Sequence, residues 1–138
     1  MPLPPQVRLE AERLLAGFPT RQELTDAVKL LAHSKDAKAD DIKQARERIS
    51  IAEDRLPKLR ALITKGTSIF DYPGLLAAGN ILYIESRGDN PGTSGHIYRM
   101  FLGTSEGYDE FQRPNMAIID FDQTGVILSV ARPGNLAL

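Results

Sequence analysis

The sequence predicts an α+β fold in which an N-terminal helical layer packs on a C-terminal antiparallel sheet of four to five strands. The hydrophobic period is helical up to Gly66 and alternating after it, and eight of the nine aromatic residues, all except Phe18, follow Gly66. Helix-favouring Ala, Leu, Lys, Arg and Glu are enriched before this point, whereas aromatic residues favour strands. With 138 residues, the chain is expected to form one domain, with a helical part over residues 1–66 and a β part over residues 67–138.

Two short helices are predicted at the start of the chain. The first follows two prolines, and its segment VRLEAERLLAG keeps its apolar residues at helical spacing until Gly17. The second begins at a capping box, TRQE, in which the Thr20 hydroxyl accepts from the Glu23 N–H and the Glu23 carboxylate reaches back. The apolar face of this second helix fades at His33.

A third, long helix is predicted from a heptad pattern. Its apolar residues are spaced alternately by three and four positions, and they are Ile42, Ala45, Ile49, Ala52, Leu56, Leu59 and Ile63. We expect Asp36 or Asp40 to cap the start of this helix and Gly66 its end. Pro57 removes a backbone donor, so a kink near Pro57, or two helices meeting there, is expected.

This heptad seam leaves two packing arrangements open. In the arrangement that we favour, it packs on the second helix and on the protein's own sheet, because three heptads are the lower limit of a coiled-coil signal. In the alternative, part of the seam binds another chain, and Ile49 and Leu56 are then partner-binding residues.

Five segments are predicted as strands, and their short connections favour antiparallel neighbours. They are SIFDY (68–72), NILYIE (80–85), HIYRMFLG (96–103), NMAIIDFD (115–122) and VILSVA (126–131). Two of these strands are apolar on both faces. We therefore expect the second face of the sheet to be wrapped by the N-terminal segment or buried against a partner.

The loop GDNPGTSGH, residues 88–96, is rich in glycine but lacks the Lys and the following helix of a phosphate-binding loop. We interpret it as a hairpin connection that contains a type II turn. The alternative is a weak anion site, formed by Arg87, Gly92, Gly95 and His96.

A catalytic alternative rests on the strands that flank this loop. If residues 85 and 96 lie opposite each other, Glu85, His96 and Tyr98 share one face of the sheet. A carboxylate and an imidazole within reach of each other can act as general base and acid, with Arg113 or Arg87 stabilising developing charge. Helices followed by such a sheet are also found in some small microbial ribonucleases, so this alternative is a small metal-independent nuclease-like enzyme.

The stretch AIIDFDQTG, residues 117–125, resembles motif I of the haloacid dehalogenase-like phosphatases, an apolar strand followed by Asp-x-Asp-x-Thr. The resemblance implies that Asp120 is a phosphoryl-accepting nucleophile and Asp122 an acid/base. That family has a parallel α/β sheet, whereas the short connections here predict an antiparallel one. We therefore favour a short turn between two apolar strands, with Gly125 in the left-handed conformation.

The loop GTSEGYDEFQRP, residues 103–114, combines acidic and aromatic side chains. The acidic residues lack the alternating oxygen-ligand pattern of a calcium loop. Aromatic residues flanked by acids suit a basic protein surface, because aromatic rings supply rigid contact area. The predicted partner-binding residues of this loop are Tyr108, Asp109, Glu110 and Phe111.

Composition and charge exclude several functional classes. The chain has no cysteine, which excludes disulfides, thiolate metal sites and cysteine nucleophiles. Its net charge is -1, and Lys and Arg alternate with Asp and Glu over residues 35–65, so nucleic-acid binding is not expected. No cofactor, metal site or membrane span is predicted.

Taken together, these patterns predict a non-catalytic cytoplasmic protein-interaction module, such as an adaptor, a chaperone or a neutralising partner. It would bind a protein partner or form a homodimer through the heptad seam and the acidic aromatic loop.

Overall fold

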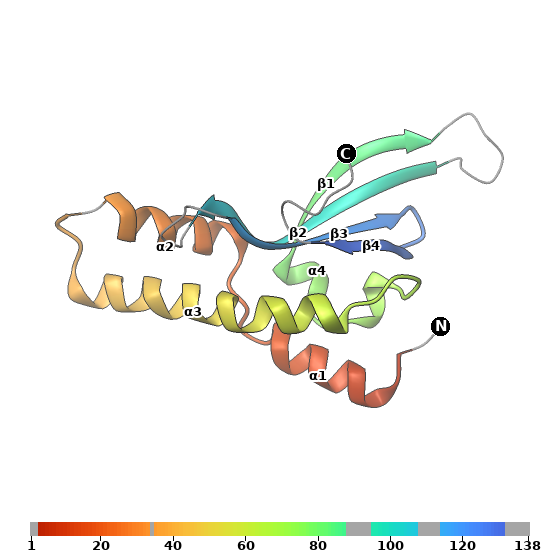
Figure 1. Cartoon of the computed structure of the whole chain (residues 1–138), viewed down its shortest axis with the longest axis horizontal. Helices are drawn as coiled ribbons and strands as arrows, with labels where there is room; N and C mark the ends of the chain where they lie inside the picture. Colours follow the sequence, from red (N-terminus) through yellow and green to blue (C-terminus); the bar gives the residue numbers. More distant parts are fainter. Residues whose placement is uncertain (1–2, 34, 88–94, 108–113, 132–138) are drawn as a thin grey trace.

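The computed structural model describes residues 3–33, 35–87, 95–107 and 114–131 (Figure 1). The elements in chain order are α1 (Pro5–Leu15), α2 (Arg21–His33), α3 (Ala39–Leu62), η1 (Ile69–Asp71), α4 (Leu75–Ala78), β1 (Asn80–Arg87), β2 (Gly95–Gly107), β3 (Pro114–Asp122) and β4 (Ile127–Ala131). Helices are followed by an antiparallel sheet, so the predicted α+β class is confirmed.

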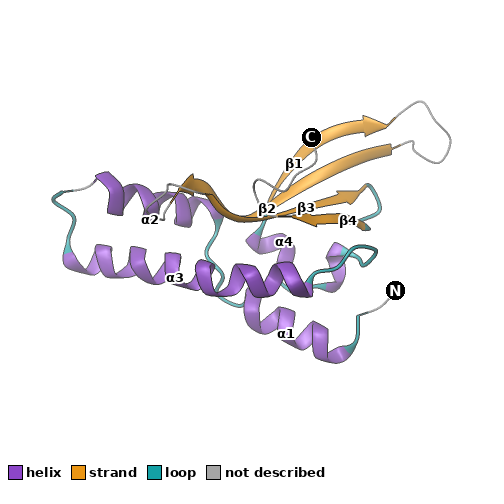
Figure 2. Ribbon diagram, in the orientation of Figure 1, coloured by secondary structure: helices purple, strands orange, loops and turns teal. Residues whose placement is uncertain are grey.

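The sheet has the strand order β1-β2-β3-β4, and each neighbouring pair is antiparallel. Figure 2 shows α3 running beneath the sheet, with α1 on the far side of α3. The helix α2 lies beside the first half of α3 and also contacts β2. The helical layer therefore covers one face of the sheet and extends beyond its end.

The first two helices begin and end as the sequence predicts. Pro5 occupies the first turn of α1, where its missing N–H costs no hydrogen bond, and Gly17 follows the helix with a φ of 68°. The Thr20 hydroxyl accepts from the Glu23 N–H at 3.1 Å, and the Glu23 carboxylate accepts from the Thr20 N–H at 3.1 Å. The pKa of Glu23 is lowered below its ordinary value, mainly because its carboxylate accepts this hydrogen bond from the Thr20 N–H. The capping box is confirmed.

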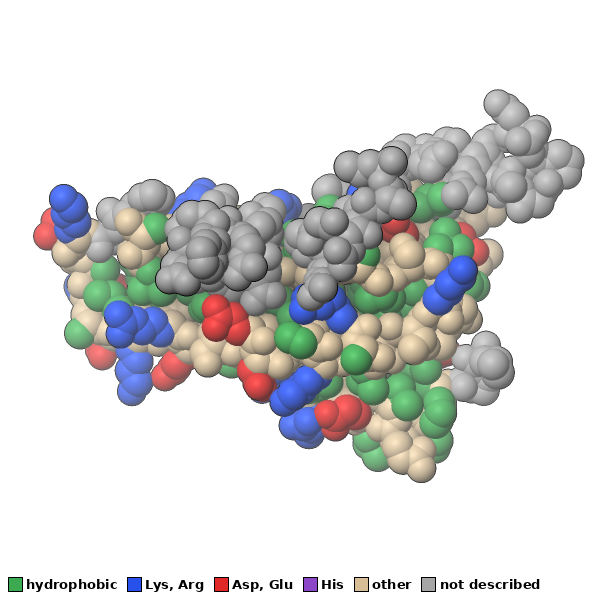
Figure 3. All heavy atoms as spheres, in the orientation of Figure 1, with side chains coloured by type: hydrophobic (Ala, Val, Ile, Leu, Met, Phe, Trp, Pro, Cys, Tyr) green, Lys and Arg blue, Asp and Glu red, His purple; other side chains and the backbone are tan. Residues whose placement is uncertain are grey.

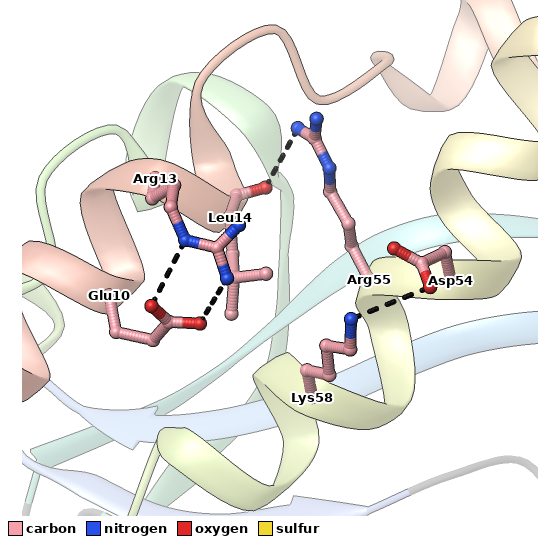
Figure 4. Close-up of polar contacts among 6 residues, drawn as sticks. All are labelled: Glu10, Arg13, Leu14, Asp54, Arg55 and Lys58. Carbon is pink, nitrogen blue, oxygen red and sulfur yellow. Dashed lines mark hydrogen bonds and ion pairs between the residues drawn. The ribbon is translucent and has the colours of Figure 1, made fainter.

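Arg55 joins α1 to α3 (Figure 4). Its guanidinium donates to the carbonyl oxygens of Leu14 at 3.2 Å and Ala16 at 2.6 Å. Carbonyls at a helix C-terminus have no partner within the helix, so Arg55 satisfies groups that would otherwise need water. Two exposed ion pairs in the same view lie within single helices, and they are Glu10–Arg13 and Asp54–Lys58.

The helix α3 is one element that includes Pro57, so the predicted division into two helices is wrong, while the kink stays a prediction. The predicted caps are also wrong. The helix starts at Ala39, so its N-cap residue is Lys38, and no side chain caps this end. Asp40 lies in the first turn instead, where the helix dipole still favours a carboxylate. At the other end the helix stops at Leu62, before Gly66 is reached.

Six of the seven heptad positions are buried inside this chain, as in the arrangement that we favour, and Ile42 is only half-buried. The second half of the seam lies in a main core with residues of the sheet, and the seam members there are Ala52, Leu56, Leu59 and Ile63. Its first half forms a smaller core with α2, made of Ala27, Val28, Ala45 and Ile49. Ile49 is 8% exposed and Leu56 is fully buried. We therefore assign both residues to the core and not to a partner surface.

Apolar side chains on both faces of β2 and β3 are buried within the chain. The face toward the helices carries Tyr98, Met100, Leu102, Ala117, Ile119 and Phe121. The Tyr98 and Phe121 rings are stacked with their centroids 5.6 Å apart. On the other face, Ile97, Met116 and Ile118 are at most 6% exposed. The second face therefore needs no partner to bury these side chains.

The predicted strand over residues 68–72 is wrong, because the segment closes into the 3-10 helix η1. The Ser68 hydroxyl accepts from the Phe70 N–H at 3.1 Å, and the Ser68 carbonyl accepts from the Asp71 N–H at 3.1 Å. These local bonds compete with strand pairing. Ser68 still forms an isolated antiparallel bridge with Val126.

Candidate functional site

The register of β1 and β2 does not place Glu85 opposite His96. Tyr83 lies opposite Tyr98, but the pairing then shifts by one residue, so Glu85 lies opposite Ile97 and His96 opposite Ser86. A β-bulge on β1 causes the shift, because one extra residue moves every later position to a new partner. The cross-strand pair that the nuclease alternative requires is therefore not formed.

The predicted anion site lies at the end of the β1–β2 hairpin. Arg87 and Gly95 are register partners, and His96 is the next residue along β2, so the backbone brings these three together. The remaining predicted site residues lie outside the described residues, and they are Gly92, Tyr108, Asp109, Glu110, Phe111 and Arg113.

The stretch that resembles a phosphatase motif is part of the antiparallel sheet. Asp120 lies within β3, and residues 122–125 connect β3 to β4 as a turn. Gly125 has a φ of 91°, which is the left-handed conformation predicted for it. The parallel sheet of that family is absent from the described part of the chain, so the turn interpretation is correct.

Asp122 holds this turn together. One of its carboxylate oxygens accepts from the Thr124 N–H at 2.8 Å, the Thr124 hydroxyl at 2.6 Å and the Val126 N–H at 3.0 Å. Burial alone would raise the pKa of Asp122, but these hydrogen bonds stabilise its charged form and together lower the pKa below its ordinary value. Asp122 is therefore a structural carboxylate that stays ionised.

A polar row crosses the second face of the sheet. The Arg99 guanidinium donates to both oxygens of Asp120, at 2.8 and 3.0 Å, and the Ser129 hydroxyl lies 3.5 Å from Asp120. The side chains of Arg99 and Asp120 are only 20% and 15% exposed. Hydrogen bonding to Asp120 raises the pKa of Arg99 above its ordinary value. The sequence analysis did not find this row, because its members come from β2, β3 and β4 and only the strand register aligns them.

Among the aromatic residues whose side chains the structure describes, Phe70 of η1 is the most exposed, at 64%. Val126, whose neighbour Gly125 lies under the ring, is 37% exposed. We call Phe70 and Val126 the Phe70 surface.

The backbone beneath Phe70 is fixed by several hydrogen bonds. The Ile69 N–H donates to the Gly125 carbonyl at 2.9 Å, and the Ile127 N–H donates to the Thr67 carbonyl at 2.8 Å. A Cβ atom on Gly125 would lie 2.5 Å from the Phe70 ring, so only glycine lets the ring rest on this turn. The backbone that carries the ring is therefore held in place, and the ring rests on Gly125 while most of Phe70 faces solvent.

Tyr72 anchors the same segment from the core side. It is 2% exposed, and its hydroxyl lies 2.7 Å from the Thr67 hydroxyl and accepts from the Thr64 N–H at 3.2 Å. The exposure of Phe70 was not predicted from the sequence, because the apolar and polar residues of SIFDY alternate as in a strand. The signal that could have found it is the following Pro73-Gly74 pair, which marks a turn.

Among the other features of the described residues, Leu9 on α1 is also an exposed apolar side chain, at 66%. Figure 3 shows Lys and Arg interspersed with Asp and Glu over α3, as expected for a solvated helix face. A hollow between α2 and α3 is lined by Asp26, Asp41 and Arg48, among others, and Arg48 lies 3.5 Å from Glu23. No His, Asp or Glu cluster suited to a metal ion occurs in the described ranges. Among the described helices, none is apolar over a length sufficient to cross a membrane.

Comparison with known proteins finds no family model, no curated protein and no solved structure that matches this chain.

Proposed function

We propose that this protein is a non-catalytic protein-interaction module, an adaptor, chaperone or neutralising partner in the cytoplasm, and that the Phe70 surface is its contact site. The observation that carries the proposal is a phenylalanine that is 64% exposed although the backbone on both sides of it is hydrogen-bonded. Exposing an apolar ring to water costs free energy that a partner would recover by covering it.

The fixed position of Phe70 matters for binding energy. Residues that dominate protein interfaces are large side chains that enter a pocket on the partner and become fully desolvated. A side chain that is already held in place loses little conformational entropy on binding. Phe70 meets this condition because Gly125 supports its ring and the Ser68 hydroxyl holds its N–H.

One further observation counts against the nuclease alternative, and another counts against the phosphatase resemblance. The β1–β2 register separates Glu85 from His96 by one position. The two carboxylates of the phosphatase-like stretch are used structurally, Asp120 by Arg99 and Asp122 by the turn before β4.

The test is affinity purification of the tagged protein from its native host, compared with two variants. We expect a stoichiometric protein partner with the wild type, and loss of most of that partner in Phe70→Ser. The matched control is Leu9→Ser, since Leu9 on α1 is 66% exposed and lies outside the Phe70 surface.

Two results would refute the proposed function. One is a partner that is retained equally by Phe70→Ser and Leu9→Ser. The other is metal-independent cleavage of RNA by the purified protein that is lost in His96→Ala, which would establish the nuclease alternative.

A further inference from the structure

The two edges of the sheet differ in how much of their backbone is paired. The strand order places β4 at one edge and β1 at the other (Figure 1). At the β4 edge, the Ile127 N–H donates to the Thr67 carbonyl and the Gly66 N–H donates to the Ile127 carbonyl, both at 2.8 Å. Ser68 adds its bridge to Val126. The segment before η1 therefore covers the start of this short edge strand.

The β1 edge has no such cover among the described residues. Within these ranges the eight residues of β1 pair with β2 alone, and no helix packs extensively on them. In an antiparallel pair, alternate residues direct their N–H and C=O groups toward the partner strand, and the residues between them direct theirs outward. β1 therefore presents a row of backbone donors and acceptors that water or another strand must satisfy.

The first half of β1 is the part suited to a further strand. Residues 80–83 pair with β2 in continuous register, and a bulge follows Tyr83. Gly79 lets this half start directly on the core, because a Cβ atom there would overlap the Met100 side chain. Proteins commonly protect exposed edges with Pro, Lys or other charged residues. Residues 80–84 include none of these, so this half of the edge lacks the usual protection.

From these features we infer that β1 pairs with β1 of a second copy of this chain, so that the two sheets join into one. A strand placed antiparallel to its own copy is related to it by a two-fold axis, so this edge is self-complementary through its backbone alone. Pairing of β1 with β4 of the next copy would instead continue without closing. The cover at the start of β4 disfavours that arrangement, so assembly stops at the dimer.

The charges of β1 agree with this arrangement. They follow the bulge, at Glu85 and Arg87. In an antiparallel pair centred on residues 80–83, the Glu85 positions of the two copies lie at opposite ends of the paired region, and so do the Arg87 positions. Like charges directly opposite each other would destabilise the pair, and this geometry keeps them apart. The dimer edge is separate from the Phe70 surface and does not depend on the proposed function.

The experiment is hydrogen exchange with mass spectrometry on the purified protein at about 1 µM and about 1 mM, with analytical ultracentrifugation over the same range. We expect a reversible monomer–dimer equilibrium, and we expect the amides of β1 to exchange more slowly as the dimer fraction rises. Peptides from β4 should exchange equally at both concentrations. Phe70→Ser should leave the equilibrium unchanged, since Phe70 belongs to η1 and not to this edge.

Two proline variants, Leu82→Pro and Tyr83→Pro, test the edge itself. Neighbouring residues of a strand direct their N–H groups to opposite sides, so one variant removes an outward donor and the other removes a donor to β2. The first should stay folded and weaken the dimer by about tenfold or more, because the two-fold axis removes the donor from both copies. The second should lose stability. Circular dichroism and thermal melts distinguish the two.

Three outcomes would overturn this inference: a monomer at every concentration, a dimer that forms while the exchange of β1 stays unchanged, or folded proline variants that dimerise like the wild type. Slow exchange of β1 in the monomer would mean that the chain itself covers this edge. If neither proline variant folds, the exchange of the wild type decides. Loss of the dimer would leave the proposed function standing, because partner capture through Phe70 is measured separately.

Discussion

Asp122 closes the turn between β3 and β4 with one carboxylate oxygen that accepts three hydrogen bonds. This turn places Gly125 under Phe70 and Val126 opposite Ser68. The charge of a single residue therefore supports the geometry of the Phe70 surface.

The first prediction concerns the acid sensitivity of this turn. The pKa of Asp122 is lowered in the folded protein, so the unfolded chain binds more protons as the pH falls through the ordinary aspartate value of about 3.9. The stabilisation is present above that pH and is lost as the pH falls toward the lowered pKa. Asp122→Asn should remove this part of the pH dependence of the unfolding free energy, measured by urea denaturation between about pH 3 and pH 7.

Asp36→Asn is the matched control, since Asp36 is an exposed aspartate. If Asp122→Asn and wild type lost stability in parallel on acidification, the turn would not depend on the ionised carboxylate.

At the scale of elements, the Arg99–Asp120–Ser129 row joins three strands across one face. Each strand contributes one member at the same register level, as the pairs Arg99–Asp120 and Asp120–Ser129 show. An ion pair in such a half-buried position contributes little net free energy, but removing one partner leaves the other charge poorly solvated.

The second prediction is that Asp120→Ala lowers the unfolding free energy by about 2 kcal/mol, the scale of hydrogen bonds to charged groups. The double variant Arg99→Met, Asp120→Leu should be more stable than Asp120→Ala alone, because it leaves no unpaired charge. Chemical denaturation of the wild type and the variants measures this. Equal stability of the double and single variants would show that the strands do not depend on this pairing.

Much of the helical part can be predicted from the sequence, because its determinants are local. The capping box at Thr20 and the seam of α3 depend on spacings within a few residues. The sequence predictions are wrong where side-chain hydrogen bonds or the strand register determine the structure. Ser68 diverts an alternating segment into η1, and a bulge after Tyr83 separates Glu85 from His96. Neither the bulge nor the Arg99–Asp120 pair can be read from a single strand's pattern, since both depend on the neighbouring strand.

At the scale of the whole molecule, α3 connects two separate cores. The main core includes Leu56 and Leu59 together with residues of the sheet, and the smaller core includes Val28 and Ile49. A small core buries less apolar area, so the end of the molecule formed by α2 and the first half of α3 opens at lower free energy than the rest.

The third prediction follows from this division. Leu59→Ala should destabilise the whole protein by about 2–5 kcal/mol, as expected for a buried leucine. Val28→Ala removes two methyl groups from the smaller core and should cost about 1.5 kcal/mol, with its effect confined to α2 and the first half of α3. Hydrogen exchange followed by mass spectrometry resolves the two regions. Equal loss of protection in both halves of α3 after Val28→Ala would mean that the two cores unfold as one.

The seam of α3 also has a consequence for synthesis on the ribosome. Leu59 lies in the same buried core as Ile119, which is made about 60 residues later. At about 5–20 residues per second, this segment emerges several seconds before its partners exist. During that interval the apolar stripe of the helix lacks the side chains of the sheet that cover it in the folded protein.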